Sequence, residues 1–82
     1  MDRMVLERHL AQAEEHVALA EALVMRQRRI VAELERDHHR TAIDARRMLA
    51  QFEAMQKEHA ATRDMIAGEL AAAQRKPAGP AR

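Results

Sequence analysis

An unbroken row of mostly apolar positions, spaced alternately four and three residues apart, runs through the first half of the chain. The row consists of Leu6, Leu10, Ala13, Val17, Ala20, Val24, Gln27, Val31 and Leu34. This spacing returns to one face of an α-helix every seven residues, so it predicts a long helix whose seam faces another helix. Neither Gly nor Pro occurs before Gly68, so nothing breaks such a helix early. We expect the first helix to cover residues 3–36.

A second row with the same alternation follows in the other half of the chain. It consists of Ala45, Met48, Phe52, Met55, His59, Thr62 and Ile66, with Leu49 and Leu70 on its flank. This row predicts a second helix over residues 42–74. Pro77 cannot continue a helix, so residues 76–82 are expected to form a disordered basic tail.

The apolar rhythm lapses over residues 37–41, where we place a turn. Thr41 is a good N-cap, and Asp44 three residues later can complete a weaker version of the capping box. The first helix must end with a residue that tolerates a left-handed conformation, a role that falls to His38 or His39. The alternative is one continuous helix through the polar stretch, which would be unusually long.

A short turn between two long helices predicts an all-α, antiparallel two-helix hairpin over residues 1–75. The apolar stripe of each helix is wider than one partner can cover, because Leu23, Ile30 and Leu49 lie beside the seams. A chain of 82 residues without disulfides also has a small core. We therefore expect two hairpins to pair as a homodimeric four-helix bundle, or another helical protein to cover the stripes.

The composition excludes several classes of function. Cys, Ser, Tyr and Trp are absent, and Thr41 and Thr62 carry the only aliphatic hydroxyls, so we expect no enzyme and no cofactor. Charged residues interrupt every apolar stretch long before the about 20 residues that a membrane span needs. The N-terminal residues lack the apolar segment of a signal peptide, so the expected location is cytoplasmic.

Several segments of the chain resemble a group of short, uncharacterised bacterial helical-hairpin proteins. The resemblance rests on residues 27–37, Thr41, residues 47–53, His59 and residues 63–64. A Gly usually follows the Asp of the turn in that group, and this chain has His38 there. The resemblance implies a small bacterial protein with the hairpin fold, and it implies no activity.

Five His and six Met residues raise the possibility of a metal-binding or haem-binding bundle through His16 and His59. In the expected hairpin, His16 lies opposite Arg63 and His59 opposite Ala20. The two imidazoles are then about one helical turn apart, unless the turn differs by a few residues. Neither His has a carboxylate or a second His at the i,i+3 or i,i+4 spacing of helical metal sites. The competing interpretation is that both are polar seam residues that fix the register.

Arginines gather on either side of the turn and provide a further alternative, weak nucleic-acid binding. The candidates are Arg26, Arg28, Arg29, Arg46 and Arg47. Acidic residues alternate with them, and the chain lacks the Tyr and Trp that stack on bases. A solvated, mixed-charge surface is the competing interpretation.

The leading hypothesis is a non-enzymatic helical module that acts through coiled-coil self-association or partner binding, without a membrane. Its expected core and interface residues are Leu10, Val17, Val24, Val31, Leu34, Met48, Phe52, Met55 and Ile66.

Overall fold

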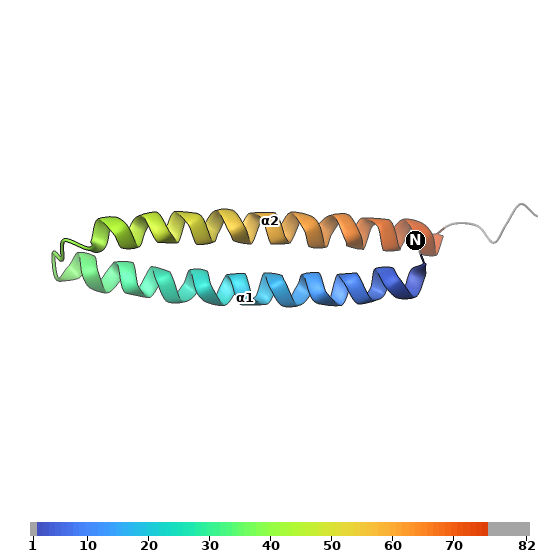
Figure 1. The fold of residues 1–82 in the computed structure, drawn as a ribbon, viewed down its shortest axis with the longest axis horizontal. Coiled ribbons are helices and arrows are strands. Elements are labelled where there is room, and N and C mark those ends of the chain that lie inside the picture. Colours follow the sequence, from blue (N-terminus) through green and yellow to red (C-terminus); the bar gives the residue numbers. More distant parts are fainter. Residues whose placement is uncertain (1, 76–82) are drawn as a thin grey trace, which may run out of the picture.

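The structure, a computed structural model, describes residues 2–75 and consists of two α-helices joined by a short turn. α1 spans Arg3–Arg36 and α2 spans Ala42–Arg75. The helices pack side by side and antiparallel, with the turn at one end and the start of α1 beside the end of α2 at the other (Figure 1). At ~1.5 Å per residue each helix is about 50 Å long. The continuous-helix alternative is therefore wrong.

α1 covers the range expected for the first helix, and α2 reaches Arg75, where the sequence predicted an end near residue 74. The expected disordered tail, residues 76–82, lies outside the described residues. Neither helix, within residues 2–75, contains a stretch apolar enough and long enough to cross a membrane.

The seam of α1 follows the row expected from the sequence. Its buried residues are Leu6, Ala13, Val17, Ala20, Val24, Gln27 and Val31. Leu10 and Leu34, which complete the row, are half-buried. One face of α1 therefore lies against α2 along its whole length.

The seam of α2 differs by one position from the expected row. It passes through Ala42, Ala45, Leu49, Phe52, Gln56, His59, Arg63, Ile66 and Leu70, all of which are buried or half-buried. Met48 and Thr62, which we expected in the seam, are exposed. The physical reason is the rotation of α2 about its axis, which buries Ala42 and Leu70 at the two ends of the contact.

The buried core between the helices is made of small side chains. Its apolar members are Leu6, Ala13, Val17, Ala20, Val24, Val31, Ala42, Ala45 and Leu70. Alanines allow the two backbones to approach closely, but they bury little apolar area per residue. The larger side chains of α2, including Phe52, stay partly exposed. The contact inside one hairpin is therefore long and thin.

Gln27 is the one polar residue that the core buries among residues 2–75, with 6% of its surface exposed. Its Nε2 donates a hydrogen bond of 3.0 Å to the carbonyl oxygen of Ala45 in the first turn of α2. A buried polar side chain with one specific partner penalises shifted pairings, in which it would lose that partner. Gln27 therefore helps to set the register of α2 against α1.

The end of α1 is a Schellman motif, in which His38 takes the left-handed position. His38 has a φ of 52°, as expected for one of the two turn histidines. Its N–H donates to the Glu35 carbonyl at 3.1 Å, and the His39 N–H donates to the Leu34 carbonyl at 2.8 Å. These bonds satisfy the carbonyls at the end of the helix and reverse the chain within a few residues.

The Thr41 side chain takes a different partner from the one expected. Its Oγ1 lies 2.7 Å from Nδ1 of His39, and the Thr41 N–H donates to the same nitrogen at 3.2 Å. The Asp44 carboxylate, which we expected in a capping box with Thr41, instead lies 3.7 Å from the Arg47 guanidinium. The two histidines thus build the turn together, one through its backbone and the other through its ring.

Replacing His38 by Gly should raise the free energy of unfolding by about 0.5–1 kcal/mol. A side chain at positive φ costs roughly 1–2 kcal/mol, which exceeds the extra entropy that Gly loses on folding. The measurement is urea unfolding followed by far-UV circular dichroism at a fixed protein concentration. His39→Gly is the matched control and should lower stability, because it removes the ring that holds Thr41. A His38→Gly variant less stable than the parent would contradict this account of the turn.

Candidate interaction surface and histidine pair

One flank of the seam carries ion pairs that join the two helices. Arg28 of α1 lies 3.3 Å from Glu53 of α2, and Glu35 of α1 pairs with Arg46 of α2. We call this flank the ion-pair side. Each pair is partly exposed and contributes about 0–1 kcal/mol. Their joint effect is to favour the rotation of α2 in which Arg46 and Glu53 face α1.

These cross-helix pairs were not foreseen from the sequence, although a signal for them was present. Arg28 and Glu35 are one heptad apart beside the first seam, and Arg46 and Glu53 are one heptad apart beside the second. In an antiparallel pair, two such rows meet with opposite charges facing each other. The facing charges can be recognised in the sequence only when the seam of α2 is placed correctly, because the seam decides which residues lie beside it.

The opposite flank of the seam is nearly uncharged, and we call it the apolar side. It consists of the residues one position before the seam, namely His9, His16, Leu23 and Ile30 of α1 and Met48, Met55, Thr62 and Glu69 of α2. A groove of 290 Å³ opens here, lined by Leu23, Arg26, Gln27, Ile30, Met48 and Phe52. Leu23 is 37% exposed and Met48 is 48% exposed. The hairpin therefore leaves large apolar side chains in contact with water along this side.

The expected core and interface residues divide into three groups in the structure. Val17, Val24 and Val31 are buried between the helices. The members of a second group are half-buried: Leu10, Leu34, Phe52 and Ile66 belong to the seams, and Met55 lies beside the seam of α2. Met48 stands apart, because it belongs to the apolar side and not to the hairpin core.

His16 and His59 lie next to each other across the seam. Their ring centroids are 5.3 Å apart and the ring planes are inclined by 52°. The sequence predicted a separation of about one helical turn along the axis, with His16 opposite Arg63 and His59 opposite Ala20, and the observed centroid distance is of the same size. The turn itself covers residues 37–41, as expected. Within residues 2–75, no group of three or more His, Cys, Asp or Glu side chains converges as a metal site.

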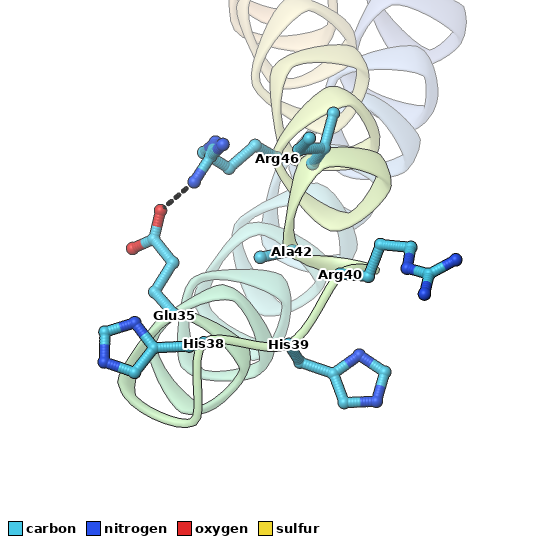
Figure 2. Close-up of a pocket in the computed structure, with 7 residues that line it drawn as sticks. Glu35, His38, His39, Arg40, Ala42 and Arg46 are labelled. Carbon is cyan, nitrogen blue, oxygen red and sulfur yellow. Dashed lines mark hydrogen bonds and ion pairs between the residues drawn. The ribbon is translucent and has the colours of Figure 1, made fainter.

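A second hollow, of 480 Å³, lies at the turn (Figure 2). Its lining includes Glu35, His38, His39, Arg40 and Arg46. Figure 2 shows the Glu35–Arg46 pair at one edge, with the His38 and His39 rings pointing away from each other. The His39 ring is already engaged by Thr41. The hollow is open to solvent, and its polar groups do not point toward a common ligand position.

Four of the five candidate arginines have places other than a common cationic patch, and the fifth, Arg29, is exposed. Arg28 and Arg46 are paired with carboxylates across the helices, and Arg47 lies 3.7 Å from Asp44. Arg26 lines the groove of the apolar side instead. Contact with phosphates would have to displace the carboxylate partners, so the geometry gives the nucleic-acid alternative little support.

Phe52 is the largest apolar side chain at the seam, and Phe52→Ala should lower the free energy of unfolding by about 3 kcal/mol. The ring belongs both to the seam and to the groove of the apolar side, so its loss removes packing contacts with α1 and with the residues that line the groove. The measurement is chemical unfolding of parent and variant at equal concentration. Met25→Ala is the control: Met25 is exposed, so its loss should change stability by no more than about 0.5 kcal/mol. Equal effects of the two substitutions would show that the Phe52 ring contributes no core packing.

No family model, no curated protein and no solved structure matches the chain. The functional conclusion therefore rests on the contrast between the two sides of the hairpin.

Proposed function

We propose that the protein is a non-enzymatic helical interaction module that pairs with a second copy of itself through the apolar side. The observation that carries this proposal is the exposure of Leu23 and Met48 around the groove beside Phe52. Large apolar side chains that gather on one side of a monomer mark a contact surface. The ion-pair side, in contrast, is already satisfied by Arg28–Glu53 and Glu35–Arg46.

The thin core of the hairpin supports the same conclusion. The fully buried residues of α2 are only Ala42, Ala45 and Leu70, and its larger apolar side chains stay partly exposed. A small domain with so little buried area is marginally stable without disulfides, metals or association. A second hairpin would bury Phe52, Met55 and Ile30 further and form a four-helix bundle.

A second copy is the occupant that fits this side best. The apolar side carries few charges, namely Glu69 in its row and Arg26 at its groove, so two copies can approach with little like-charge repulsion. The helices are equal in length, as the four helices of a bundle require. Twofold pairing places the same surface on both partners, so each Leu23 and Met48 finds an equivalent apolar environment. Another helical protein of the same pattern is the runner-up occupant.

The scarcity of side-chain hydroxyls and the lack of thiols make a binding role the better-supported class of function. The hydroxyl of Thr41 is engaged by the His39 ring, and the side chain of Thr62 is exposed. The two hollows are open and lack a convergent acid, base and nucleophile. We therefore propose that the protein acts by contact and not by catalysis.

Sedimentation equilibrium of the full chain tests this proposal, and it should give the mass of a dimer at micromolar concentrations. Refractive-index detection is needed because the chain has no Trp or Tyr. Met48→Glu should weaken the dimer at least tenfold, because association would desolvate the added carboxylate. Ala50→Glu adds the same charge at an exposed position outside the apolar side and should leave association unchanged.

Two outcomes would contradict the proposal. A fully helical parent chain that stays monomeric at about 100 μM would exclude self-association at any useful affinity and favour the partner-protein alternative. Equal weakening by Met48→Glu and Ala50→Glu would show that the copies pair through a different surface. Far-UV circular dichroism of both variants separates loss of association from loss of folding.

A further inference from the structure

We propose that His16 and His59 form a cross-helix site that binds one divalent transition-metal ion of the kind that prefers imidazole ligands, such as Zn²⁺. One ligand comes from the middle of α1 and the other from the middle of α2. Their ring centroids lie 5.3 Å apart, which brings two imidazoles from different helices into contact. The site lies within a single hairpin, so it does not depend on self-association.

The spacing of the two rings matches the spacing that a shared ion requires. Zn–N bonds are about 2.0–2.1 Å long, so each ring centre lies roughly 3.2 Å from the ion, and two rings at a tetrahedral angle have centres about 5.2 Å apart. The observed separation is 5.3 Å, with ring planes inclined by 52°. The last torsion of a His side chain is broad, so the nitrogens can turn toward a common ion without moving the helices.

The surroundings of the pair leave an ion accessible and its remaining ligand positions open. His16 is exposed and His59 is half-buried, so water can reach the site and complete the coordination. The nearest cation by helical spacing is Arg63, one turn after His59, and its guanidinium is held by the neighbouring Asp64 carboxylate at 3.0 Å. That pairing offsets the charge that would oppose a metal ion.

The other histidines show what distinguishes this pair. His38 and His39 are adjacent in the chain, but their rings point away from each other (Figure 2). The Nδ1 atom of His39 is occupied by Thr41. His9 lies one heptad before His16 on the same row of α1 and serves as a matched control, because the residue one heptad after His59 in the seam of α2 is Ile66, which cannot bind a metal ion.

A metal ion bound by one residue from each helix would hold α1 and α2 together and stabilise the hairpin. It would bind the folded hairpin and not the unfolded chain, in which the two rings are 43 residues apart in sequence (59 − 16). Both histidines lie near the middle of their helices. In a fully overlapping twofold dimer, the pairs of both copies would therefore meet at the same level, whichever direction the second hairpin runs. The ratio of ions to chains then reports whether water or the second copy completes the coordination.

The experiment is titration of the metal-free full chain with Zn²⁺, followed by calorimetry and by thermal unfolding. Saturating Zn²⁺ should raise the melting temperature by about 5 °C, and Mg²⁺, which prefers oxygen ligands, should leave it unchanged. His16→Ala and His59→Ala should each abolish the shift, whereas His9→Ala should retain it. One ion per chain or one per two chains would support the site.

No Zn²⁺ binding by the parent chain, or equal loss of the shift in His9→Ala and His16→Ala, would overturn the proposal. If an alanine variant fails to fold, nuclear magnetic resonance of the parent chain shows which histidines bind the ion. Zn²⁺ must then shift the ring signals of His16 and His59 ahead of those of His9, His38 and His39. Dimerisation measured in the presence of a chelator is independent of this outcome, so the metal site and the proposed self-association can fail separately.

Discussion

The contact between the two seams is the interaction on which the rest of the structure depends. Two helices of about 50 Å touch along one row each, and the row on α1 is built mainly from Val and Ala. Small side chains keep the backbones close, and this closeness allows Gln27 to reach the Ala45 carbonyl. The same closeness brings His16 beside His59 and lets the cross-helix ion pairs form. A wider core would separate these groups.

The two flanks of the seam have different physical characters because each helix carries different residues on either side of its row. Charges of opposite sign meet on one flank, where Arg28 faces Glu53. On the other flank Leu23, Ile30 and Met48 surround a groove that neither helix fills. Exposed ion pairs contribute little stability, but they favour the rotation of α2 that the seam contact sets and that leaves these apolar residues outside. The surface available for association is thus a consequence of how the hairpin satisfies its charges.

The histidines illustrate how one residue type serves different purposes in one fold. His38 supplies a backbone conformation, and its neighbour His39 supplies a ring that holds Thr41. His16 and His59 are far from the turn and meet across the seam. Their meeting depends on the length of the turn, because the addition of a few residues there would shift α2 along α1 by a helical turn. The turn and the histidine pair are therefore linked, although about half of the hairpin's length separates them.

The sequence by itself determined the local features of this protein, and only the tertiary structure decided the relative placement of the helices. The spacing of Leu6 through Leu34 fixed α1 and its buried face, because a helix presents the same face every seven residues. The second row was ambiguous, since Ala45, Phe52, His59 and Ile66 can be completed by the Met48 series or by the Leu49 series. The Met48 series was the wrong choice. Burial of Ala42 and Leu70, together with the Arg46 and Glu53 ion pairs, selects the other rotation. Such a choice, like the meeting of His16 and His59, depends on contacts between residues far apart in the chain, and periodicity along one helix carries no information about them.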